Sequence, residues 1–359
     1  MERRHETAPL VVAMSELPRR LMRWEVGLCL LIVLVTAASS LLSSDFLTPF
    51  NLQTMALSAT VLGFLSLGVA PVIMAGDIDI SIASILALCG VVMAVLWQHG
   101  MNIWLAGVIA IALGVVLGLV NGLLTVLLEL PSLAITLGTL GAYTGIAFLI
   151  LQGKAITNFP DALVNLGQGG LFGSLFPIAS LAVLVMAAIL AFVIHGTTFG
   201  KAVFAIGGNR QAARYSGIAV TRTRILLFLI SGGVSGLAAI FYLGNFNTAR
   251  ADIASDQVLP AVTVAILGGV SAYGGKGTIP GVVLALILLS VLEAGLGVLG
   301  LSGQEQTISI GILLIVAIGS GNVIRSAHRW TRWRPWQQRP RPLERKEEPQ
   351  VNITAPQEH

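Results

Sequence analysis

Two aspartates and two serines interrupt apolar sequence in the run Gly76-Asp77-Ile78-Asp79-Ile80-Ser81-Ile82-Ala83-Ser84. Two compatible interpretations remain open. The run is a tight turn in which Asp79 or Ser81 caps the next helix, or a broken helix whose polar turn lines a solute pathway. Asp77 and Asp79 are two residues apart, so they cannot share one face of a helix. The spacing therefore argues against a paired-carboxylate acid–base site.

Two further polar residues lie inside long apolar stretches. Glu293 lies about 18–20 Å from the N-terminal end of its stretch, at about 1.5 Å per residue. Exposure to lipid is costly for a carboxylate, so Glu293 is expected to face the protein interior or a cavity. It could form an interhelical hydrogen bond, contact a solute or couple transport to protons. Asn121 suits helix–helix contact. The candidate substrate-pathway residues are therefore Asp77, Asp79, Ser81, Ser84, Asn121 and Glu293.

A glycine-rich junction invites comparison with a phosphate-binding loop. Its members are Gly268, Gly269, Ser271, Gly274, Gly275 and Gly277. The Walker pattern fails, because Val270 stands where the first glycine should be and Gly277 follows Lys276 in place of Ser or Thr. The sequence also shows no metal cluster, no Ser-His-Asp set and no Cys-His set. We expect a non-catalytic chain that binds neither a metal nor a cofactor.

The composition indicates the elements that position these residues. Of 359 residues, 55% are hydrophobic and only 11% are charged, against about 25% charged in soluble domains. Many glycines and few aromatic residues favour a helical bundle over a β-barrel. Spanning helices need roughly 20 apolar residues. We predict an all-α polytopic membrane protein with about ten transmembrane helices, some broken or short, near 26–42, 57–74, 81–97, 103–128, 133–151, 177–194, 225–243, 259–270, 281–299 and 308–323.

The basic residues predict the orientation of the chain. Every Lys and Arg except Lys154 and Arg250 falls inside if both termini are cytoplasmic, as the positive-inside rule requires. The basic charge is thus a topology signal, and no nucleic-acid partner is expected. We divide the chain into a cytoplasmic segment 1–25, a transmembrane domain 26–324 and a basic, disordered cytoplasmic tail 325–359. A cleaved signal peptide is the less favoured interpretation of the first stretch.

The longest charged segment between predicted spans is 196–224. Within it, Asn209 before and Gly217 after are the start and stop signals of a short helix from about Arg210 to Tyr215. The residues alone leave two interpretations open. The segment is a solvated loop, or it contains a small docking helix for a cytoplasmic partner.

Five segments in the same order resemble the permease subunits of bacterial ABC importers of the ribose, xylose, arabinose, rhamnose and autoinducer type. The resemblance extends from about Phe46 to Ile318. Its segments are the G-x-x-D-x-S-x-x-S pattern of 76–84, Asn121-Gly122, the stretch 131–139, Phe199-Gly200-Lys201 with 207–218, and the glycine-rich 268–281. The chain departs from the family at Asp77 and Ala83, where glycine is common, and at Glu293, where an amide is common.

The resemblance implies a mechanism and partners. Such permeases pair with a second permease copy or a paralogue in the lipid of the bacterial inner membrane, and a periplasmic binding protein delivers the solute. Cytoplasmic ATPase subunits use ATP and Mg and dock on a coupling segment. Here this segment is 196–224, and its candidate docking residues are Gly208, Asn209, Ala212, Ala213 and Gly217. The solute would be a monosaccharide or a similar polyol-like molecule. The alternative is a secondary transporter that couples an ion through Asp79 or Glu293.

Overall fold

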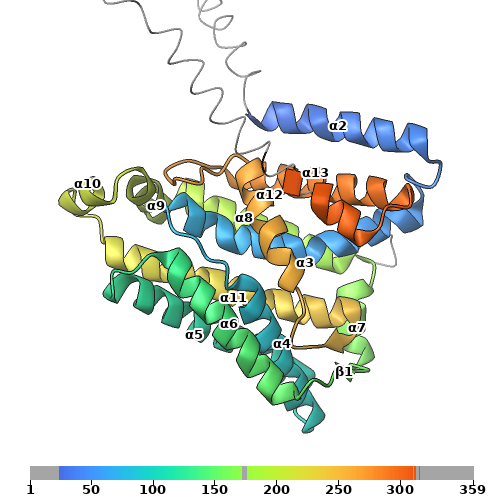
Figure 1. Cartoon of the computed structure of the whole chain (residues 1–359), viewed down its shortest axis with the longest axis horizontal. Coiled ribbons are helices and arrows are strands. Elements are labelled where there is room, and N and C mark those ends of the chain that lie inside the picture. Colours follow the sequence, from blue (N-terminus) through green and yellow to red (C-terminus); the bar gives the residue numbers. More distant parts are fainter. Residues whose placement is uncertain (1–23, 172–175, 310, 313–314, 316–359) are drawn as a thin grey trace, which may run out of the picture. The chain divides into compact units, whose positions relative to one another are not determined.

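The computed structural model describes residues 24–171, 176–309, 311–312 and 315, and these belong to one structural unit, Met1–Ile318. The described residues are almost entirely helical (Figure 1), which confirms the predicted all-α class. The helices are α2 (Trp24–Leu42), α3 (Pro49–Met74), α4 (Ile82–Gln98), α5 (Ile103–Leu127), α6 (Ser132–Leu151), α7 (Asp161–Gln168), α8 (Ile178–Gly196), α9 (Thr198–Gly208), α10 (Arg210–Tyr215), α11 (Val220–Phe246), α12 (Val258–Leu267) and α13 (Ile279–Val298). A short antiparallel ladder joins β1 (Ile156–Thr157) to β2 (Thr248–Ala249), and a 3-10 turn, η2 (Ser255–Gln257), precedes α12.

Within the described part of the chain, seven helices are long and apolar enough to cross a membrane. They are α2, α3, α5, α6, α8, α11 and α13. Two shorter apolar helices, α4 and the η2–α12 segment, occupy the predicted third and eighth stretches. The tenth stretch, 308–323, lies largely outside the described residues. Every other predicted stretch coincides with an apolar helix, and the total of ten crossings stays a prediction.

Helix α3 lies at the centre of this unit. It contacts α8, α11, α12 and α13, and all its residues from Thr60 to Met74 are buried. A helix that is apolar on every side suits such an environment. Helix α11 runs antiparallel to α3, because Asn245 donates a hydrogen bond to the Leu57 carbonyl while Arg224 reaches Asp77 beyond the other end of α3.

Helices α5 and α11 pack through small residues. A Cβ atom on Gly114 would overlap the Gly232 carbonyl oxygen, and one on Gly118 would overlap the Phe228 carbonyl oxygen. Glycines four residues apart let two helix backbones approach closely inside a membrane. This close glycine packing of α5 against α11 was not predicted, although the four-residue spacing of the glycines is visible in the sequence.

Candidate functional site

Three stretches that the sequence suggests separately meet at the C-terminal end of α3, which we call the junction end. The Gly275 N–H donates to the Met74 carbonyl at 2.8 Å. A Cβ atom on Gly207 would overlap both the Met74 carbonyl oxygen and the Gly275 nitrogen, and Gly274 lies against Gly76 with a φ of +82°. A side chain at these positions would clash or strain the backbone. The polar run, the coupling segment and the glycine-rich junction are thus in direct backbone contact.

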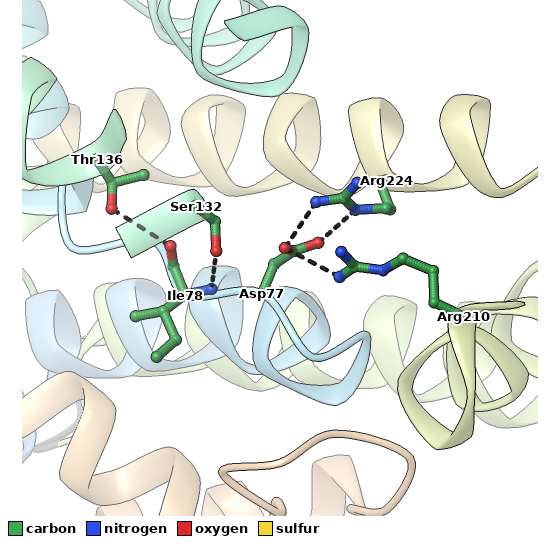
Figure 2. A network of polar contacts seen from close by, with 6 residues as sticks. All are labelled: Asp77, Ile78, Ser132, Thr136, Arg210 and Arg224. Carbon is green, nitrogen blue, oxygen red and sulfur yellow. Dashed lines mark hydrogen bonds and ion pairs between the residues drawn. The ribbon is translucent and has the colours of Figure 1, made fainter. Parts of the chain in front are cut away.

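Asp77 pairs with two arginines of the coupling segment (Figure 2). The Arg224 guanidinium donates from Nε to Asp77 Oδ2 at 2.7 Å and from Nη2 to Oδ1 at 2.8 Å, while Arg210 Nη2 reaches Oδ1 at 3.2 Å. The side chains of Asp77 and Arg224 are 4% and 9% exposed, whereas that of Arg210 is 43% exposed. The Asp77–Arg224 contact is therefore a buried, bidentate ion pair, and loss of either partner would leave a buried charge uncompensated.

The backbone between α3 and α4 is held by side chains of α6. The Ile78 N–H donates to Ser132 Oγ at 3.0 Å, and Thr136 Oγ1 donates to the Ile78 carbonyl at 3.3 Å, as Figure 2 shows. Buried backbone groups outside a helix need such partners. The non-helical segment is therefore tied to α6 as well as to the coupling segment.

Asp79 is the centre of a second buried network. Its Oδ1 accepts hydrogen bonds from the Ser81 N–H at 3.0 Å and the Ser81 hydroxyl at 2.6 Å, and its Oδ2 accepts one from the Ser231 hydroxyl at 2.8 Å. Asn121 Nδ2 donates to Ser81 Oγ at 2.7 Å, and the Tyr143 hydroxyl donates to Asn121 Oδ1 at 3.2 Å. The network joins the turn to α5, α6 and α11. Sequence reasoning missed Ser231 and Tyr143.

These contacts bear on the two interpretations of the polar run. Ser81 precedes α4 but caps it with no side-chain hydrogen bond, while Asp79 accepts the Ser81 N–H. Ser84 Oγ donates to the Ser81 carbonyl at 2.8 Å. The run is thus a hydrogen-bonded turn before α4, and its assignment to the substrate pathway stays a prediction.

The predicted short helix of the coupling segment is confirmed as α10. Asn209 Oδ1 accepts the Ala212 N–H at 2.9 Å, and Gly217 follows the helix with a φ of +79°. The two alanines differ, because Ala213 is buried while Ala212 is exposed. A Cβ atom on Gly208, which precedes Asn209, would meet no atom within 4 Å. The exposed surface of α10 therefore includes Ala212 and excludes Ala213.

The rest of the glycine-rich junction separates α12 from α13. A Cβ atom on Gly268 would come within 2.6 Å of the Val282 backbone, and Gly269 adopts a φ of +90° beside Trp24. The Ser271 N–H donates to the Lys276 carbonyl at 3.0 Å and closes the loop that contains Gly274 and Gly275. Gly277 follows this loop directly with a φ of +151°. The junction is a backbone-packing element, not a phosphate loop.

Glu293 lies apart from the other candidate pathway residues. It lines a polar cavity of about 370 Å³ between α3 and α13, near the N-terminal end of α3, which we call the cavity end. The polar residues of this cavity are Asn51, Thr54, Ser58, Ser290, Glu293 and Gln306. Sequence reasoning missed five of them, although 51, 54 and 58 share the helical spacing i, i+3 and i+7. From Thr54 to Met74, α3 separates the two ends by about 30 Å.

The described residues contain no group of three or more His, Cys, Asp or Glu placed to hold a metal ion.

A bundle of long apolar helices with hydrogen-bonded polar breaks is the architecture of a multi-pass membrane transport protein. Comparison with known protein families agrees with this architecture. Residues 51–318 match the family described as the branched-chain amino acid transport system permease component. The chain therefore belongs to this family of permeases.

Relatives in the family have a more specific description. The autoinducer 2 import system permease protein LsrD of Salmonella typhimurium is 32% identical over 323 residues, which covers 88% of this chain and 96% of the relative. LsrD of Yersinia enterocolitica is 33% identical over 318 residues, with 86% and 95% covered. No solved structure matches the chain.

The family confirms the class that the sequence resemblance implies. The chain is the permease subunit of a bacterial ABC importer and a multi-pass protein of the inner membrane. It is a non-catalytic subunit, and the ATPase is a separate chain.

Proposed function

We propose that this permease carries a small, neutral, hydroxyl-bearing solute, such as a monosaccharide or an autoinducer-like polyol, which a periplasmic binding protein delivers. Cytoplasmic ATPase subunits, using ATP and Mg, drive transport, and a second permease copy or a paralogue completes the pathway. The observation that carries the proposal is the junction end, where α10, the α3–α4 turn and the glycine-rich junction touch. Movement of α10 would pass directly to the polar turn.

We propose ten membrane crossings with both termini in the cytoplasm. The charge distribution on the described helices supports this topology. Lys154 and Arg250 flank the β1–β2 ladder, which lies at the opposite end of α11 from Arg224. The other described basic residues of the loops lie around α9, α10 and the glycine-rich junction. The junction end is then cytoplasmic and the cavity end faces the periplasm, with domains 1–25, 26–324 and 325–359.

We assign ATPase docking to the segment 196–224. Support comes from α10, on which Ala212 is exposed. The small side chain of Ala212 would let this helix fit closely into a groove of the partner. Arg210 and Arg214 are also exposed on this helix and can meet acidic groups of the partner. Asp77, Asp79, Ser81, Ser84 and Asn121 then act between the docking helix and the pathway.

Uptake by the reconstituted complex tests the function. The permease, its partner permease, the ATPase and the binding protein are placed in proteoliposomes, after thermal-shift screening of the binding protein against pentoses, hexoses, deoxysugars and the autoinducer. We expect accumulation of the screened solute only with ATP and binding protein. Accumulation that persists without the ATPase and disappears with an uncoupler would instead identify a secondary transporter.

A further inference from the structure

We propose that the polar cavity at the cavity end is a solute subsite, selective for neutral polyhydroxylated molecules, in which Glu293 accepts hydrogen bonds from the solute. The inference rests on the proposed function and adds the residues that hold the solute. The cavity is about 370 Å³ in volume, and its lining side chains come from α3, from α13 and from Gln306.

Two helices each turn one polar stripe toward this cavity. Helix α3 lines it with positions 51, 54, 55 and 58, and α13 lines it with positions 290, 293, 294 and 297. Both sets follow the spacing i, i+3, i+4, i+7, which places them on one face of a helix. Ser290 and Glu293 are the polar side chains of an otherwise apolar α13, while Ala294 and Gly297 leave space beside them. Two independent helices therefore converge on one polar volume.

The lining is rich in hydrogen-bond acceptors. Four of its side chains already donate a hydrogen bond to a nearby backbone carbonyl oxygen, at distances of 2.7 to 3.0 Å. These four are Asn51, Thr54, Ser290 and Gln306. Glu293 has no hydrogen bond or ion pair with any other described residue. Glu293 is half-buried, and a half-buried carboxylate is stabilised by hydrogen-bond donors. A polyol would supply such donors as several O–H groups.

The charge of the lining opposes a zwitterionic solute. Among the described residues that line the cavity, Glu293 is charged and none is Lys, Arg or His. An amino acid could place its ammonium group beside Glu293, but its carboxylate would meet no cation and would be repelled by the same side chain. A neutral polyol has no such penalty. The cavity thus favours a polyol over the branched-chain amino acids that the family description mentions.

Thiol labelling tests occupancy directly. Ser58→Cys is introduced into a chain carrying Cys29→Ser, because Cys29 is the exposed cysteine among the described residues. The complete complex is then modified with a membrane-impermeant maleimide in the presence of D-ribose, L-rhamnose or L-leucine. We expect at least one sugar to slow labelling several-fold while L-leucine does not, and Glu293→Gln to abolish that protection. Protection by L-leucine alone, or by neither sugar, would overturn the proposal.

Uptake separates this inference from the proposed function. In the same proteoliposomes we expect Glu293→Gln to reduce sugar accumulation at least tenfold, with ATP hydrolysis changed less than twofold. Glu305→Gln is the matched control, because Glu305 carries the same charge nearby, is exposed and does not line the cavity. Failure of the wild-type complex to import would contradict the proposed function. Wild-type import with Glu293→Gln equally active would contradict only the subsite.

Discussion

The two ends of α3 hold their charged groups in opposite ways. At the junction end, Asp77 is paired with Arg224 and Asp79 accepts three hydrogen bonds, and glycines bring backbones into contact. At the cavity end, Glu293 faces open volume with no partner among the described residues. A closely packed region whose polar groups are all paired transmits movement from one segment to the next, because no segment can move without breaking a contact. The subsite that we propose needs the opposite, an open region with an unpaired hydrogen-bond acceptor.

The largest effect should come from breaking the junction ion pair. Arg224→Ala leaves the Asp77 carboxylate buried with only the more exposed Arg210 beside it, and such a loss costs about 3–5 kcal/mol. The free energy of unfolding in detergent, measured by denaturant titration, checks this value. Arg222→Ala is the control, because Arg222 is exposed two residues away. Equal stability of the two variants would show that the pair does not hold the junction end.

Neighbouring glycines test the backbone contact. Gly207→Ala places a Cβ atom into the Met74 carbonyl and the Gly275 nitrogen, while Gly208→Ala meets no atom within 4 Å. Overpacking of this kind costs about 1–3 kcal/mol, so the Gly207 variant should unfold at lower denaturant concentration and the Gly208 variant should match wild type. If both behave alike, the three stretches are not in the contact that the junction end requires.

The two alanines of α10 separate docking from folding. Ala212→Glu adds a charge on an exposed position, so stability should change by less than about 0.5 kcal/mol, while co-purification with the ATPase falls about tenfold. Ala213→Glu buries a carboxylate without a partner, so it should reduce the yield of folded permease. Full ATPase co-purification with Ala212→Glu would remove α10 from the docking surface.

The smallest effect on stability is expected at the cavity end. Glu293→Gln and Asp77→Asn are the same chemical change, from carboxylate to amide. Because Glu293 has no partner among the described residues, its variant should unfold within about 0.5 kcal/mol of wild type, whereas Asp77→Asn should approach the loss seen with Arg224→Ala. Thermal unfolding of both variants provides the comparison, and a large loss with Glu293→Gln would place it in a structural contact.

The sequence determined the features that depend on near neighbours. Apolar runs predict α2, α4 to α6, α8, α11 and α13 within about five residues at either end, because hydropathy is a property of the run itself. The second run was predicted to begin at Leu57, so the polar start of α3 from Pro49 was missed. Asn209 and Gly217 predict the bounds of α10, because capping acts over three or four residues. The sequence did not indicate α9 (Thr198–Gly208), which lies inside the segment that we expected to contain a single short helix.

Only the tertiary structure decided which distant groups meet. Arg224 lies 147 residues from Asp77, and no local spacing encodes that pairing. The same holds for Gly76, Gly207 and Gly274, which come together because three chain segments fold against one end of α3. Ala213 is buried while its neighbour Ala212 is exposed. Asp77 and Asp79 are buried as well, whereas Glu293, which the sequence grouped with them, is only half-buried. Helical periodicity is local, but the direction in which each face points depends on the packing of the whole bundle.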